Sequence, residues 1–145
     1  MSSATARRAA AILRDRARAN RETRTATKTV AAGPAPMSAH LLAGGVSPLT
    51  AHSYSAAVTK KAKGLGRTAE QGTTAKKRPG KKGLTVARTN DLGRKRHHRI
   101  VPVALWTRED ITAVALSGYR PKNAEVADFL ARIALGRPAA ARAAA

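Results

Sequence analysis

The chain has 145 residues, a formal net charge of +20 at pH 7 and no cysteine, which excludes disulfides and thiolate metal ligands. Its large apolar side chains (Val, Ile, Leu, Met, Phe, Trp and Tyr) number only 29. No apolar run approaches the roughly 20 residues that a transmembrane segment needs. A high charge with so few side chains to bury is typical of partial disorder. We therefore expect a mainly α protein with a small folded part and long, largely disordered basic arms.

The segment 1–32 predicts a basic helix rich in Ala and Arg, regular over 4–25, with a narrow apolar stripe that includes Leu13. At about 100° per residue, four arginines fall within about 60° of one another and form a basic ridge suited to phosphates. The alternative is a solvated helix in which Asp15 and Glu22 pair with neighbouring arginines. The ridge consists of Arg7, Arg14, Arg18 and Arg21.

The run of Gly and Pro at 33–36 ends this helix, because proline cannot continue a helix and pushes the preceding residue to extended geometry. We expect 33–46 to be a linker. Ser47 as N-cap and Pro48 in the first helical position predict a second, short helix over 47–64. The cations of its last turn suit the helix dipole and are further candidate phosphate contacts: Lys60, Lys61 and Lys63.

Residues 60–99 contain fourteen Lys or Arg against Glu70 and Asp91, and no aromatic side chain. A segment with this charge and so little to bury stays extended unless an anion neutralises it, so we expect 65–99 to be a disordered arm. A nucleic-acid backbone is the obvious anion, and such contacts position a protein without reading bases. The arm residues expected to bind nucleic acid are Lys76, Lys77, Arg78, Lys81, Lys82, Arg94, Lys95, Arg96 and Arg99.

The composition changes sharply after the arm. The quarter of the chain that follows holds fourteen of the 29 large apolar residues, so we expect 100–136 to be the folded module and 137–145 a frayed Ala/Arg tail. The pattern predicts a strand and then two helices. Thr107 and Asp110 form a variant of the capping box before the first helix, and Asn123 is the N-cap of the second.

This order of a strand and two capped helices resembles the ribbon-helix-helix family of DNA-binding repressors. In that family, strands of two subunits pair into a ribbon that enters the major groove, and the resemblance implies that Arg99, Val101 and Val103 share one face of the ribbon. An ordinary helical hairpin is the alternative fold. A unit this small also leaves apolar side chains partly exposed unless a partner covers them, so we expect a homodimer. The side chains concerned are Trp106, Phe129, Leu130 and Ile133.

Two other stretches resemble helix-turn-helix DNA-binding proteins. Residues 45–51 are similar to the turn and the start of a recognition helix, with room for barely two helical turns between Pro36 and Gly44. Residues 107–127 are similar to the first two helices of response-regulator-type helix-turn-helix domains. Each resemblance implies that the chain binds duplex DNA.

The sequence contains no arrangement typical of catalysis. Paired carboxylates, a Ser/His/Asp set and a phosphate-binding glycine loop are absent in any suitable context, and the four histidines do not form a metal-binding pattern. We therefore expect no enzymatic activity, no metal and no cofactor.

The leading hypothesis is a non-enzymatic, cytoplasmic DNA-binding accessory or regulatory protein, with DNA favoured over RNA. The preference for Arg over Lys and the abundance of Ala and Gly point to a high-GC bacterium, where a plasmid or phage is the expected source. A mitochondrial presequence is the alternative interpretation of the Arg-rich start. The alternative functions are a ribosomal or other RNA-associated protein, and a conjugative plasmid transfer or spread protein whose partners include an anionic membrane surface.

Overall fold

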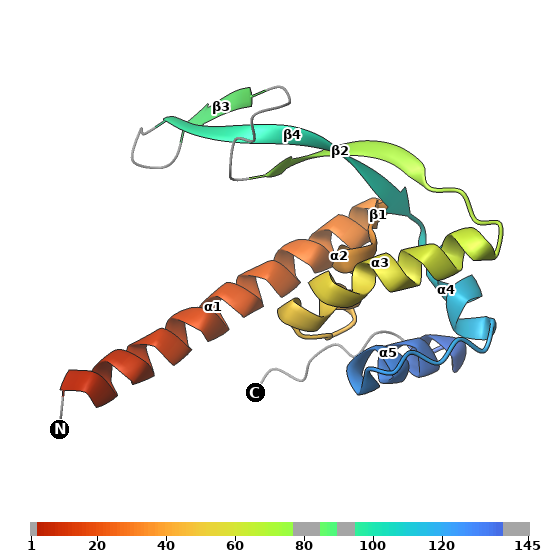
Figure 1. Cartoon of the computed structure of the whole chain (residues 1–145), viewed down its shortest axis with the longest axis horizontal. Coiled ribbons are helices and arrows are strands. Elements are labelled where there is room, and N and C mark those ends of the chain that lie inside the picture. The colour runs from red at the N-terminus through yellow and green to blue at the C-terminus, as the bar shows by residue number, and fades with distance from the viewer. Residues whose placement is uncertain (1–2, 77–84, 90–94, 138–145) are drawn as a thin grey trace. The chain divides into compact units, whose positions relative to one another are not determined.

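The computed structural model describes residues 3–76, 85–89 and 95–137. It is mainly helical, which confirms the expected class at that level, and two of its strand pairs are antiparallel (Figure 1). The chain divides into two compact units, which we call the helical unit and the strand unit. They comprise Met1–Thr68 with Trp106–Ala145, and Ala69–Leu105.

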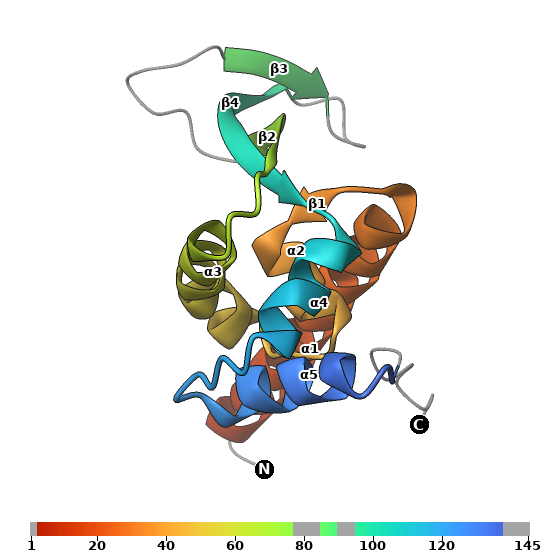
Figure 2. The same cartoon turned by 90° about the vertical axis from the view of Figure 1, so that its right-hand side faces the viewer.

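The helical unit contains five helices among its described residues, together with a two-residue strand, β1 (Figure 2). Their bounds are α1 Ser3–Ala32, β1 Ala35–Pro36, α2 Met37–Ala43, α3 Pro48–Gly64, α4 Arg108–Leu116 and α5 Ala124–Ala134.

Helix α1 continues to Ala32, within the expected segment 1–32 and beyond its expected regular stretch of 4–25. Its buried residues, Ala26 and Val30, lie in the C-terminal turns, and the helix packs mainly against α2. The N-terminal two thirds of α1 are almost entirely exposed. At about 1.5 Å of rise per residue, this helix is about 45 Å long, so most of it is a surface element.

Helix α2 lies within the segment that the sequence predicted to be a linker. Five of its seven residues are buried, and it packs between α1 and α3. The prolines before it and the glycines after it limit the helix to two turns, and tertiary burial stabilises a helix this short. Its buried residues are Met37, Ala39, His40, Leu41 and Leu42.

The two C-terminal helices share one core with α2 and α3. Helix α5 contacts both α3 and α4, and α4 also contacts α3. The segment expected to fold as a separate module is therefore joined in its core by residues from the first half of the chain. The largest fully buried side chains come from all four helices and from the end of a strand: Trp106, Leu41, Ile111, Val58, Val114 and Val126.

Side chains that suggested a homodimer are covered within one chain. Trp106 is 1% exposed, Phe129 is 3% exposed and Leu130 is 2% exposed. Only Ile133 of the four residues is partly exposed. The exposed apolar side chains that favoured a partner subunit are thus largely absent, because helices α2 and α3 of the same chain bury them.

His40 links α2 to the segment that leads into α4. Its ring is buried, and Nε2 lies 2.8 Å from the carbonyl oxygen of Trp106. Burial lowers the pKa of His40, and the hydrogen bond to Trp106 opposes this effect. The neutral ring fits the contact when Nε2 carries the proton and donates to the carbonyl.

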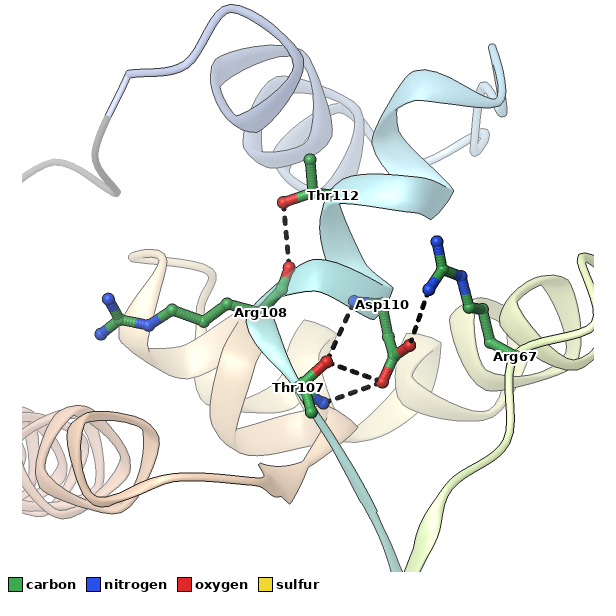
Figure 3. A network of polar contacts seen from close by, with 5 residues as sticks. All are labelled: Arg67, Thr107, Arg108, Asp110 and Thr112. Carbon is green, nitrogen blue, oxygen red and sulfur yellow. Dashed lines mark hydrogen bonds and ion pairs between the residues drawn. The ribbon is translucent and has the colours of Figure 1, made fainter.

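The capping box predicted at the start of α4 is confirmed (Figure 3). The Asp110 amide donates to Thr107 Oγ1 at 3.2 Å, and the Thr107 amide donates to Asp110 Oδ2 at 3.0 Å. The other carboxylate oxygen of Asp110 lies 3.7 Å from Nη1 of Arg67, just after α3. This buried carboxylate therefore holds the start of α4 and the segment after α3 together. The predicted N-cap at Asn123 is also confirmed, because its Oδ1 accepts from two amides of α5.

The strand unit contains β2 Glu70–Lys76, β3 Thr85–Thr89 and most of β4 Lys95–Trp106. Both β2 and β3 pair antiparallel with β4. The described residues of 65–99 thus include paired strands, where a disordered arm was expected; residues 77–84 and 90–94 lie outside the described residues. Antiparallel pairing gives the backbone N–H and C=O groups hydrogen-bond partners whatever the side chains are, so a low apolar content does not by itself exclude strands. β4 also begins before the expected strand, and Pro102 lies opposite Thr73 within the paired stretch.

Candidate nucleic-acid interface

Helices α2 and α3 are joined by a tight turn with a defined geometry. Gly45 has a φ of +88°, in the left-handed region that glycine enters without steric cost. Its amide donates to the carbonyl of Leu42, and the amide of Val46 donates to the carbonyl of Leu41, both at 3.1 Å. This is the Schellman pattern that ends a helix and redirects the chain. The result is two helices joined by a short turn, with barely two turns in the first helix.

The start of α3 matches the expectation of Ser47 as N-cap and Pro48 in the first turn. Ser47 does not cap the helix with its own side chain. Instead, its amide donates to Glu125 Oε2 at 2.9 Å, and its hydroxyl lies 2.9 Å from the same oxygen. A carboxylate from α5 therefore lies at the N-terminus of α3, where the helix dipole favours negative charge.

Helix α5 also contacts the turn directly. The ring of Phe129 lies against Gly44, and Nη2 of Arg132 donates to the Gly44 carbonyl at 3.0 Å. Glu125, Phe129 and Arg132 are spaced by four and three residues, which places them on one face of α5. Three side chains of one helix thus hold the position of the turn and the start of α3.

The face of α3 that lies opposite its buried residues is exposed to solvent. Ala51, Val58 and Ala62 are buried, whereas the side chains on the other side of the helix are exposed, as the helical period requires. We call these exposed residues the open face of α3. It consists of Leu49, Ser53, Ala56, Lys60 and Lys63.

Leu49 and Ser53 were not among the site residues expected from sequence. The signal that locates them is the helical period of the apolar residues Ala51, Val58 and Ala62, which are buried. The face opposite them follows from about 100° of rotation per residue.

The three lysines expected from α3 separate in the structure. Lys60 and Lys63 are exposed on the open face. Lys61 is partly buried, and its Nζ lies 5.9 Å from the centroid of the Tyr119 ring, a cation–π geometry. Lys61 is therefore engaged with the segment between α4 and α5, and only the other two lysines are available to a ligand of the open face.

The arginine ridge of α1 is one continuous exposed surface. Arg7, Arg14, Arg18 and Arg21 are all exposed. Their mean direction lies roughly 130° around the helix from the buried residues Ala26 and Val30. The ridge therefore faces away from the packed side of α1, and Lys28 extends it along the same face.

In the strand unit, the register pairs cationic residues with one another. Lys76 lies opposite Arg99, and Arg88 lies opposite Arg96, with Lys95 at the end of β4. Arg88 was not among the predicted site residues. The remaining predicted arm residues lie outside the residues that the structure describes: Lys77, Arg78, Lys81, Lys82 and Arg94.

The described residues contain no group of three or more His, Asp or Glu side chains placed to hold a metal ion. No helix in that part of the chain has both the length and the apolar character that crossing a membrane requires. Comparison with models of protein families, with curated proteins and with solved structures finds no significant match.

Proposed function

We propose that this chain is a non-enzymatic protein that binds duplex DNA through the helix-turn-helix formed by α2 and α3. In such proteins the second helix lies in the major groove and its N-terminal residues reach the base edges. Here that helix is α3. Its open face is the observation that carries the proposal, because the turn before it is held by α5 while the face itself is left uncovered.

The order of elements along the chain supports the proposal. A helix, a short strand, a helix-turn-helix and then strands joined by basic connections follow one another. Residues 45–51, which resemble the turn and the start of a recognition helix, lie at the turn between α2 and α3 and in the first turn of α3. The ribbon-helix-helix interpretation has less support, because β4 pairs with β2 and β3 of its own chain.

The charges supply the sequence-independent part of the binding. The register places Arg88 opposite Arg96 and Lys76 opposite Arg99, so cationic residues recur along the paired strands. The ridge of α1 adds a second set of cations, and such contacts to phosphates fix position and orientation without reading sequence.

The biological role that best fits this chemistry is an accessory or regulatory DNA-binding protein in the cytoplasm of a high-GC bacterium, encoded by a plasmid or phage. The composition that supported this source also supports the two alternatives, RNA association and plasmid transfer. Each alternative predicts a different preferred partner: folded RNA, or an anionic lipid surface.

Fluorescence anisotropy with the full chain tests the proposal. Duplex DNA of about two helical turns and an RNA duplex of the same sequence are titrated between about 50 and 200 mM salt. We expect tighter binding to DNA and a log–log salt slope of roughly −7, as about eight phosphate contacts require. Tighter binding to RNA would support the ribosomal alternative, and binding only to anionic vesicles would support the transfer alternative.

A further inference from the structure

Leu49 is the most exposed large apolar side chain among the described residues, with 81% of its surface accessible. It lies in the first turn of α3, directly after Pro48. Isolated exposed leucines are common and need no explanation. The position of this one matters, because the first turn of the second helix is where a helix-turn-helix brings side chains to the base edges.

The residues beside Leu49 offer few groups that recognise bases. Ser53 is one turn further along the open face, and its hydroxyl donates to the carbonyl of Leu49 at 2.8 Å, so its proton is used within the helix. His52, at the margin of this face, lies 3.8 Å from the carboxylate of Glu22. Ala56 follows on the next turn. The N-terminal half of this face therefore carries none of the Arg, Asn or Gln side chains that read guanine or adenine with two hydrogen bonds.

An apolar side chain can still distinguish one base. Thymine presents a C5-methyl group in the major groove, and apolar contact with that methyl is an established form of base recognition. We propose that Leu49 reads thymine by packing against its C5-methyl group, and that this contact sets the base preference of α3. The inference rests on the proposed function, since it requires α3 to enter the major groove.

The expected size of the effect follows from the area buried. Removing one methyl group from an apolar contact weakens binding about fourfold, and the same factor applies to each further methyl that Leu49 covers. The lysines on this face, Lys60 and Lys63, contact phosphates in this arrangement and add no base preference. The preference for thymine therefore depends on Leu49, whereas the salt dependence of binding does not depend on Leu49.

The probe is the tightest-binding duplex that the full-length protein selects from a randomised pool. Its affinity is compared with that of the same duplex carrying deoxyuridine in place of every thymidine, which removes only the methyl groups. The wild-type chain is expected to bind the thymine duplex at least about fourfold more tightly. Leu49→Ala is expected to bind both duplexes equally, at the level of the deoxyuridine duplex.

Leu116→Ala is the matched control, because Leu116 is also a largely exposed leucine, 67% accessible, but lies on α4. This variant should keep the wild-type preference for thymine. Equal binding of both duplexes by the wild-type chain, with an unchanged salt slope, would overturn the role of Leu49 and leave the proposed function intact. A randomised pool that yields no preferred sequence would also overturn the role of Leu49, because α3 would then recognise no base. Loss of all binding to DNA would instead reject the proposed function itself.

Discussion

The ring of Phe129 in α5 occupies the space that a side chain at Gly44 would need. A β-carbon built on Gly44 would overlap with two carbons of that ring, Cδ2 and Cε2. Gly44 has an ordinary helical φ of −75°, so its backbone does not require glycine. The contact alone excludes a larger residue, and through it α5 holds the turn between α2 and α3.

We predict that Gly44→Ala lowers the free energy of unfolding by about 1–3 kcal/mol, because the added methyl overpacks the contact with Phe129. Urea denaturation of the full chain measures this value. Gly64→Ala is the control, because nothing lies within 4 Å of a β-carbon at Gly64. Since Gly64 is helical, this second change should raise stability by about 0.5–1 kcal/mol. Equal effects of both substitutions would contradict the packing argument.

A second prediction concerns the capping box at the start of α4. Asp110→Ala removes the acceptor for the Thr107 amide and the partner of Arg67, and we expect it to cost about 1–3 kcal/mol of unfolding free energy. Glu109→Ala in the same helical turn removes an exposed carboxylate and should cost less than about 0.5 kcal/mol. Thermal unfolding of the two variants measures both losses of stability. A larger loss for Asp110→Ala shows that the buried cap matters, and equal losses would indicate a general effect of negative charge near the helix N-terminus.

His40 makes stability depend on pH in a defined direction. The folded state keeps His40 neutral because burial lowers its pKa below the ordinary value of 6.5. As the pH falls below that value, the unfolded chain binds a proton that the folded chain does not, so stability decreases until the folded-state pKa is reached. Urea denaturation at several pH values above and below 6.5 measures this loss.

His40→Gln is the variant that isolates this residue, because the glutamine amide can still donate to the Trp106 carbonyl but does not titrate. We expect the acid-induced loss of stability to become smaller in this variant. A wild-type pH dependence in the His40 variant would show that other groups cause it.

The ridge of α1 is tested by two triple variants of equal charge. Arg7, Arg14 and Arg18 lie on the ridge, whereas Arg8, Arg16 and Arg24 are exposed on other sides of the same helix. Changing the ridge set to Gln should reduce the magnitude of the salt slope for duplex DNA by about 2.7, or about 0.9 per lost contact. The other set should change it much less. Identical slopes for the two variants would mean that charge alone matters and the ridge has no special role.

A third set of substitutions tests the basic segment of the strand unit. Lys76, Lys77, Arg78, Lys81 and Lys82 changed together to Gln should weaken binding to every duplex to a similar degree and flatten the salt slope. Anisotropy with two unrelated duplex sequences measures both effects. An unchanged slope would reject this segment as a phosphate contact.

Much of the local structure could be predicted because it depends on residues close together in the chain. The helix starts after Ser47, Thr107 and Asn123 all lie where the sequence placed them. At Thr107 and Asn123 the cap depends on the side chain of that residue and on amides within the next turn, so local chemistry is sufficient. The same holds for the exposed row of arginines on α1, which follows from the helical period.

The candidate site was predicted only in part. Its cations were found from charge alone, but the first half of the helix-turn-helix was expected to be a linker, because a helix of two turns has weak intrinsic stability. Burial of Leu41 and Leu42 against neighbouring helices stabilises it. Leu49 gained significance only when its position relative to the turn was known.

The amino-acid sequence by itself determined the absence of disulfides and the places where helices begin, and its charge is the basis on which we propose a polyanionic partner. Tertiary structure decided which residues of α3 are free, since Lys61 lies over the Tyr119 ring while Lys60 is exposed. It also decided that Phe129 packs on Gly44 rather than on a second subunit. Charge and capping act locally along the chain, whereas burial depends on segments that are distant in sequence, and only the folded chain brings those segments together.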